Sequence, residues 1–196
     1  MWKFKTPGIP DEYFERTDDV PITKEEVRVI QISKGRLCPG NIVYDIGCGS
    51  GSITVEAALQ IESNGKIYAI DNDPNAISLT RKNLDKFGIS NVEIILGDAK
   101  QKISSLPLAD VIFIGGTGGD TKDIVNLCYD KLKPGARIVV GIILIETLYA
   151  VLETMNKLNF DSVDITQVTI SKSRKTSTGT MMLARNPVTI ISATKK

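Results

Sequence analysis

Apolar and polar residues alternate in blocks from residue 40 to residue 158, and the blocks predict strands and helices in alternation. Short apolar runs, typical of buried parallel strands, occupy residues 42–46, 66–70, 92–96, 111–114 and 137–143. Residues at helical spacing lie between or after them, at 52–61, 74–87, 121–132 and 146–158. Because the strands are apolar almost throughout, we expect an α/β fold in which helices cover both faces of a mostly parallel sheet.

The two ends of the chain depart from this alternation. Residues 1–22 are rich in Pro and Asp without a clear period, which predicts an N-terminal arm outside the core, followed by one domain over residues 23–196. Thr23 and Glu26 have the spacing of a capping box, so a helix is expected from Thr23 to about residue 36. Strand-like residues 161–170 and 180–193 flank the basic stretch 171–178, which predicts an antiparallel hairpin joined by a loop.

Glycines and acids gather where the predicted parallel strands end, which is where such sheets bind ligands. The strand ends carry the turn Asp45-Ile46-Gly47-Cys48-Gly49-Ser50-Gly51, then Asp71, then Gly97-Asp98-Ala99, and finally Gly115-Gly116-Thr117-Gly118-Gly119. Each has a structural alternative, because a glycine turn can simply bend the backbone and Asp98 can cap a short helix. Together, in successive positions, they predict one binding site.

The spacing of the glycines in the first turn limits the classes of ligand that fit it. A dinucleotide turn reads G-x-G-x-x-G, whereas this turn reads G-x-G-x-G, and no Lys-Ser/Thr pair of a P-loop follows it. Asp45 precedes the first glycine by two residues. A carboxylate there would repel a pyrophosphate and suits a nucleoside ligand with a cationic end.

Composition excludes several other chemistries. The chain has 24 basic and 23 acidic residues, a formal net charge of +1, so no general attraction to nucleic acid is expected. It contains no histidine and no CxxC pair, so we expect no metal site, and Cys48 is interpreted as a small buried filler. The first residues lack the apolar run of a signal peptide, and no run reaches ~18 apolar residues, which predicts a cytoplasmic protein without membrane contact.

As a set, the strand-end motifs and Leu132–Gly135 resemble class I S-adenosylmethionine-dependent methyltransferases over about residues 40–145. The resemblance implies a Rossmann-like, seven-stranded sheet with an antiparallel last strand, and S-adenosyl-L-methionine as cofactor. It also implies that Asp71 binds the ribose hydroxyls and that Asp98 and Ala99 lie at the adenine. The residues implied to wrap the methionine and ribose are Gly47, Cys48, Gly49, Ser50 and Gly51.

A narrower resemblance covers nearly the whole chain. Together with Ile114–Gly119, the stretches Pro10–Phe14, Thr23–Arg28, Ile145–Thr147 and Gly179–Val188 are similar to decarboxylating precorrin methyltransferases of cobalamin biosynthesis. That family methylates carbon 15 of the tetrapyrrole macrocycle and removes the carboxyl group of the acetate arm on ring C; the anaerobic form acts on cobalt-precorrin-6B. The resemblance further implies that Thr23 lines the cofactor site and that the protein is a homotetramer.

Candidate substrate residues follow from the shape and charge of such a substrate. The bare backbone of Gly115–Gly119 could let a flat macrocycle lie close to the transferred methyl, so Gly115 and Gly118 are predicted to contact it. Gly116 and Thr117 are candidates at the reacting centre, and Glu146 is a further one whose alternative is a helix-start acid. Arg174 and Arg185 are predicted to meet the substrate carboxylates, with a solvated hairpin loop as their alternative.

Two other functions stay open at this point. An RNA methyltransferase of the same fold is one, although the fourth strand is followed by Gly115-Gly116-Thr117-Gly118 and not by Asn/Asp-Pro-Pro-Tyr/Phe. The balanced charge of the chain is a further argument against an RNA substrate. A cofactor-binding subunit without catalysis is the other, and a methyl-transfer measurement separates it from an enzyme.

Overall fold

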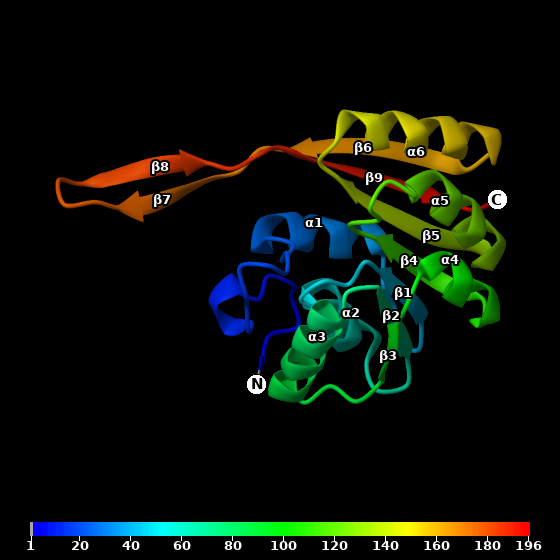
Figure 1. Cartoon of the computed structure of the whole chain (residues 1–196), viewed down its shortest axis with the longest axis horizontal. Coiled ribbons are helices and arrows are strands. Elements are labelled where there is room, and N and C mark those ends of the chain that lie inside the picture. The colour runs from blue at the N-terminus through cyan, green and yellow to red at the C-terminus, as the bar shows by residue number, and fades with distance from the viewer. Residues whose placement is uncertain (1) are drawn as a thin grey trace.

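A seven-stranded sheet forms the centre of the computed structural model, which describes residues 2–196 (Figure 1). Its strand order is β3-β2-β1-β4-β5-β9-β6, in which β9 runs antiparallel to both of its neighbours. The strands are β1 (Ile42–Ile46), β2 (Lys66–Asp71), β3 (Val92–Leu96), β4 (Ala109–Ile114), β5 (Leu132–Ile142), β6 (Asp161–Val168) and β9 (Val188–Thr194). The predicted mostly parallel sheet with an antiparallel last strand is therefore confirmed.

Helices cover both faces of this sheet, as the apolar strands predict. Helices α1 and α2 pack with α3 on one face, around a cluster that includes Val43, Ile67 and Val139. Helices α5 and α6 pack on the other face, around Ile112, Ile138 and Met155. The helices are α1 (Glu25–Gly35), α2 (Ser52–Ile61), α3 (Pro74–Phe87), α4 (Ala99–Lys102), α5 (Thr121–Lys131) and α6 (Ile145–Lys157). None of the helices in residues 2–196 is long and apolar enough to cross a membrane.

The N-terminal segment differs from the expected arm outside the core. Ile9 and Phe14 are buried in a cluster with Val55, Leu84 and Phe87 of α2 and α3. A short 3-10 helix, Asp11–Tyr13, lies between Ile9 and Phe14. The segment packs because a few apolar side chains reach pockets on distant helices, which a search for periodicity does not detect. The division of the chain at residue 23 stays a prediction.

An ion network ties this segment to α1 and α2. Arg28 is fully buried, and its Nε donates a 2.6 Å hydrogen bond to Glu56 on α2. Its guanidinium also lies 3.3 Å from Asp11 and donates to the carbonyl oxygens of Thr23 and Ile9. Glu56 in turn accepts from the backbone N–H groups that flank this region, at Gly8 and Ile9. The network holds residues 8–23 in place beside the two helices.

Thr23 does not cap α1, which corrects the prediction from the sequence. The N-cap residue is Lys24, and no side chain of the cap donates or accepts there. Instead, the carboxylate of Asp11 accepts from the backbone N–H of Glu25 at 3.0 Å. A carboxylate from the preceding segment thus satisfies a free N–H of the first turn, which leaves the Thr23 side chain available for another role.

The basic stretch 171–178 is not simply a loop, which is a second correction. Ser171–Lys175 forms β7, which pairs with β8 (Thr180–Ala184) in a separate two-stranded sheet. Figure 1 shows this hairpin projecting away from the rest of the molecule, beyond the ends of β6 and β9. All ten of its strand residues are exposed. The predicted pairing of the two C-terminal strands holds within the main sheet, between β6 and β9.

Candidate active site

A cavity of about 630 Å³ opens at the carboxyl ends of β1, β4 and β5, beside α1. Four segments from distant parts of the chain line it: residues 21–24, 47–49, 115–119 and 141–144. Its walls include the side chains of Val27, Phe113 and Val139 from α1 and the sheet. The volume is in the usual range for a small-molecule site.

The glycine turn after β1 packs against other segments of the protein as well as facing the cavity. A Cβ at Gly47 would lie 2.4 Å from the carbonyl oxygen of Gly116, and one at Gly49 would lie 2.9 Å from that of Pro21. Gly47, Cys48 and Gly49 line the cavity, whereas Ser50 and Gly51 do not. The turn therefore needs glycine so that three backbone segments can meet at the site.

Asp45 places a buried carboxyl group on the cavity wall. Only 3% of Asp45 is exposed, and its carboxylate accepts a hydrogen bond from the hydroxyl of Thr54. Burial raises the pKa of Asp45 to about 6, with Asp71 adding a smaller upward effect against the Thr54 hydrogen bond. At neutral pH, Asp45 is thus an anion that forms no salt bridge within residues 2–196, and a cationic ligand group would stabilise it.

Cys48 behaves as the small buried residue that the sequence predicts. Its thiol lies 3.5 Å from the hydroxyl of Thr80 and is buried in the turn. Burial, with the charge of Asp45 adding to it, raises the pKa of the Cys48 thiol well above its usual range. The thiol is therefore protonated at neutral pH and is a poor nucleophile.

The acids at the ends of β2 and β3 already hold backbone groups. Asp71 accepts from the N–H of Gly49 at 2.9 Å and from that of Asp73 at 3.0 Å, one on each carboxylate oxygen. Asp98 caps α4 by accepting from the N–H of Lys100 at 2.9 Å. Asp98 therefore has the capping role that the sequence offered as the alternative to ligand binding. Asp71, Asp98 and Ala99 are half-buried and lie outside the cavity lining. Since a carboxylate has about four acceptor sites, each acid can still bind a ligand.

The glycines after β4 form one wall of the cavity. A Cβ at Gly115 would lie 3.0 Å from the carbonyl oxygen of Gly47, so this glycine allows the β1 and β4 turns to touch. A Cβ added at Gly116, Gly118 or Gly119 would have no neighbouring atom of residues 2–196 within 4 Å. Thr117 lies between them, and its hydroxyl is hydrogen-bonded to that of Thr121 on α5.

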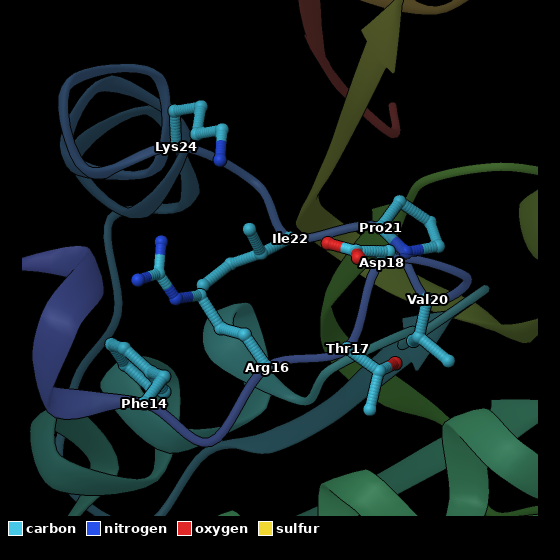
Figure 2. A pocket seen from close by; sticks show the side chains of 8 residues that line it. All are labelled: Phe14, Arg16, Thr17, Asp18, Val20, Pro21, Ile22 and Lys24. Atoms are coloured by element: carbon cyan, nitrogen blue, oxygen red, sulfur yellow. The ribbon is translucent and has the colours of Figure 1, made fainter.

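Residues 21–24 separate this cavity from a second one of about 750 Å³ (Figure 2). Thr23 lines the first cavity only, and Lys24 lines both. In Figure 2 the cationic ends of Arg16 and Lys24 lie on the same side of Ile22. The second cavity is built from residues 14–24 and does not reach the ends of the strands.

The remaining predicted site residues lie outside the cavity. Glu146 is exposed in the first turn of α6, and the cavity is lined by its neighbour Thr147. Arg174 is exposed on β7. Arg185 lies 3.2 Å from Glu26, which anchors the base of the hairpin to α1 together with the 2.6 Å ion pair between Lys172 and Glu26.

Sequence reasoning missed several cavity residues. Three further residues also line the cavity: Gln31 on α1, Gly141 on β5 and Val188 on β9. Each lies within an ordinary helix or strand pattern, so only their packing reveals them. For Gly141 a signal existed, because glycine inside a predicted strand often marks a close approach of another group.

The residues present fit S-adenosylmethionine. The glycine turn and the side-chain-free wall at Gly116 leave room along the strand ends, Asp45 offers a carboxylate to a cationic end, and Asp71 offers acceptors to a ribose. The strand order, with antiparallel β9 between β5 and β6, and the site at the carboxyl ends define the class I methyltransferase fold.

Comparisons with known proteins define the family within that class. The sequence profile of the precorrin methyltransferase domain matches residues 12–195, and the chain belongs to this family. It is 45% identical, over 99% of its length and 98% of the relative's, to a "Probable cobalt-precorrin-6B C(15)-methyltransferase (decarboxylating)" of Saccharolobus solfataricus.

Solved structures agree with this membership. A protein of Methanobacterium thermoautotrophicum called precorrin 8W decarboxylase has a TM-score of 0.89 and 39% identity, over 94% of this chain and 98% of that one. A precorrin-6y C5,15-methyltransferase of Geobacter metallireducens has a TM-score of 0.89 and 34% identity, over 97% and 98%. The predicted family is therefore confirmed.

Proposed function

We propose that this protein methylates carbon 15 of cobalt-precorrin-6B, with S-adenosyl-L-methionine as methyl donor, and removes the carboxyl group of the acetate arm on ring C. The reaction would belong to cobalamin biosynthesis. The activity printed in the name of the Saccharolobus solfataricus relative supports the proposal, because that relative matches almost the whole chain. A cytoplasmic location stays a prediction from the sequence.

One observation carries the proposal for a flat substrate. Gly116 has no atom within 4 Å of a built Cβ, and its φ is not in the left-handed region. Neither neighbouring protein atoms nor backbone strain therefore requires glycine there. A flat macrocycle lying against this backbone does require it, and Gly115 and Gly118 extend the same wall.

The cofactor would lie along the strand ends. Asp45 would bind its ammonium group, Asp71 its ribose hydroxyls, and Asp98 with Ala99 its adenine edge. Gly47, Cys48, Gly49, Ser50 and Gly51 would surround its methionine and ribose, and Thr23 would close the site from the N-terminal segment. The support for Thr23 is that its side chain is not used as a helix cap and that it lines the cavity.

S-adenosylmethionine supplies a methyl group on a sulfonium, a good leaving group. The protein then mainly has to align the acceptor carbon and exclude water, and such positioning can supply about 7–11 kcal/mol of the barrier. Apolar walls at Val27, Phe113 and Ile142 suit water exclusion. Gly116 and Thr117 would lie at the reacting centre, and Glu146, exposed and outside the cavity, has less support.

Basic side chains would meet the outer carboxylates of the macrocycle. Lys24 lines the cavity, so it joins Arg174 and Arg185 as a candidate. The ion pair of Arg185 with Glu26 gives that residue a structural role as well. Arg174, exposed on β7, would contact substrate only if another subunit brought its hairpin to the site.

We further propose that the protein is a homotetramer held together through its hairpin. An isolated two-stranded sheet is marginal in water, and among residues 2–196 the strands β7 and β8 pair with each other only, apart from the ion pairs of Lys172 with α1. Met181, Met182 and Leu183 on β8 are exposed. Three consecutive apolar residues at the mouth of the cavity, Ile143–Ile145, are also exposed. Such surface is typical of subunit contacts.

The deciding experiment incubates the protein with cobalt-precorrin-6B and S-adenosylmethionine and follows the products by mass spectrometry. We expect the macrocycle to gain one methyl group and to lose carbon dioxide. Cofactor binding without either change would instead support a non-catalytic subunit. Methylation of bulk tRNA with an unchanged macrocycle would support an RNA methyltransferase.

A further inference from the structure

Gln31 is a polar residue in a largely apolar part of the cavity wall. It lies on α1, is 7% exposed and lines the cavity. Its amide is not among the fully buried polar atoms without a partner in residues 2–196, which are Ser50 Oγ and Ser192 Oγ. A ligand group that enters the cavity can therefore reach this amide and accept a hydrogen bond from it.

The strand opposite is shaped around this amide. A Cβ at Gly141 on β5 would lie 2.2 Å from Nε2 of Gln31 and 3.5 Å from its Cδ. Any side chain at position 141 would therefore displace the amide. The φ of Gly141 is not in the left-handed region, so the backbone conformation does not require glycine, and the missing side chain leaves the space that the Gln31 amide occupies.

Strand order separates Gln31 from the part of the site that suits the cofactor. The ribose acid Asp71 ends β2, and Gly141 lies on β5, three strands away in the order β2-β1-β4-β5. At about 4.8 Å a strand, this is roughly 14 Å across the sheet. The methionine turn ends β1, and the Gly115–Gly119 wall ends β4. Gln31 thus lies on the β5 side of the site, away from the strand ends that are proposed to hold the cofactor.

The walls around Gln31 are apolar and uncharged. Val27, Phe113, Val139 and Val188 surround this end of the cavity. The charged side chains that line the cavity are Lys24 and Asp45. Lys24 begins α1, about 10 Å along the helix axis from Gln31, and Asp45 lies on β1, on the far side of β4.

We propose that Gln31 binds the carboxyl group that the reaction removes, the one on the acetate arm of ring C. The inference rests on the proposed function and adds where decarboxylation takes place. Carbon 15 is next to ring C, so a macrocycle that brings carbon 15 to the cofactor also brings this arm into the cavity. The amide N–H of Gln31 donates to one carboxylate oxygen without neutralising the charge.

The chemistry favours a neutral donor at this place. During decarboxylation the bond between the methylene carbon and the carboxyl carbon breaks, and its electron pair passes into the conjugated macrocycle. Carbon dioxide leaves, and solvent later supplies one proton to the carbon framework. A cation beside the carboxylate would stabilise the substrate before the reaction and so slow it. Apolar walls instead weaken the solvation of the carboxylate and favour the transition state, in which the charge spreads into the macrocycle.

The test compares the wild type with Gln31→Leu, which keeps the volume and removes the amide. Gln60→Leu on α2 makes the same change at a residue outside the cavity and serves as control. We expect Gln31→Leu to bind the macrocycle at least tenfold more weakly in an absorbance titration without cofactor. Its carbon dioxide release should fall by a similar factor or more, while calorimetry should give an S-adenosylmethionine affinity within twofold of the wild type.

The possible outcomes separate the two proposals. If wild-type protein leaves cobalt-precorrin-6B unchanged, the proposed function fails. If the wild type is active and Gln31→Leu matches it in macrocycle binding and carbon dioxide release, the assignment of Gln31 fails. A loss of cofactor affinity equal to the loss of macrocycle affinity also overturns it, because the amide would then bind the methionine end.

Gln31→Glu gives a readout that a structural role would not produce. Its carboxylate would repel the substrate carboxylate at neutral pH, and protonation would restore a donor. We therefore expect its rate of carbon dioxide release, divided by that of the wild type, to rise as pH falls. Asp45 and Lys24 are the charged groups that face the cavity, and the ratio cancels their effect because both proteins share them. A ratio that does not change with pH contradicts the assignment.

Discussion

At the scale of single residues, the burial of Asp45 couples folding to pH. Burial raises its pKa from 3.8 to about 6, so the folded chain keeps a proton there that the unfolded chain has released. Because the folded pKa is the higher one, this residue lowers the free energy of unfolding as pH rises from about 4 to above 6. The full effect is about 3 kcal/mol.

We therefore expect Asp45→Asn to be more stable than the wild type at pH 7, and to lose most of this advantage at pH 4. Urea titrations without cofactor at the two pH values measure the difference. Asp123→Asn, an exposed acid on α5, is the control and should show no such pH dependence. An equal difference between Asp45→Asn and wild type at both pH values would contradict the interpretation.

Asp71 is a second residue of interest, because its carboxylate is proposed to bind the ribose hydroxyls of the cofactor. Asp71→Asn keeps the shape but removes the charge and one of two acceptors for the N–H groups of Gly49 and Asp73. We expect S-adenosylmethionine to bind more weakly by about 1.5–3 kcal/mol, more than tenfold, as measured by calorimetry.

Asp73→Asn is the matched control for this change, two residues away. Asp73 caps α3 by accepting from the N–H of Asn75, and asparagine caps helices as well as aspartate does. Its cofactor affinity should equal that of the wild type. Equal losses in the two variants would mean that Asp71 acts only by shaping the loop.

At the scale of elements, the most consequential contact is the one that binds the N-terminal segment to α1 and α2. Arg28→Met leaves Glu56 buried with its backbone donors but without its counter-charge. Breaking one side of a buried pair typically costs about 3–5 kcal/mol, and we expect a loss of this size in urea unfolding.

A second substitution tests whether the unpaired charge of Glu56 causes this loss of stability. Glu56→Gln in the Arg28→Met background removes the charge that has lost its partner, so we expect it to recover part of the stability. No recovery would show that the loss came from packing of the Arg28 side chain, which also lies over the ring of Phe14 at 4.7 Å.

At the scale of the whole molecule, the proposed role of the projecting hairpin in subunit assembly can be tested by removing the hairpin. Ser171 and Ala184 face each other in the β7–β8 register, so an Asn-Gly turn can join them and replace the hairpin. If the protein assembles through the hairpin, we expect this variant to sediment as a smaller species than the wild type while it keeps its helical circular dichroism. An unchanged sedimentation coefficient would place the subunit contacts elsewhere.

Local patterns predicted most of the sheet. The order of strands and helices, the glycine turn after β1 and the acid after β2 follow from short-range periodicity and turn chemistry. The side chain of Asp73 caps α3, and Pro74 in its first turn is a further local signal for the start of a helix. By contrast, the pattern at Thr23 and Glu26 predicted a cap that Asp11 provides, because a free N–H bonds to whichever acceptor the fold brings near.

The sequence by itself determined the fold class and the family and indicated a site at the strand ends, because periodicity and turn motifs are each contained in short stretches of the chain. Tertiary structure alone decided that Ile9 and Phe14 of the N-terminal segment join the core, that Gln31 lines the cavity opposite Gly141 and that Ser171–Lys175 is a strand. Gln31 and Gly141 are about a hundred positions apart, and their contact exists only because α1 packs on β5. Contacts between such distant residues form by packing in three dimensions, and packing leaves no periodic trace in the chain.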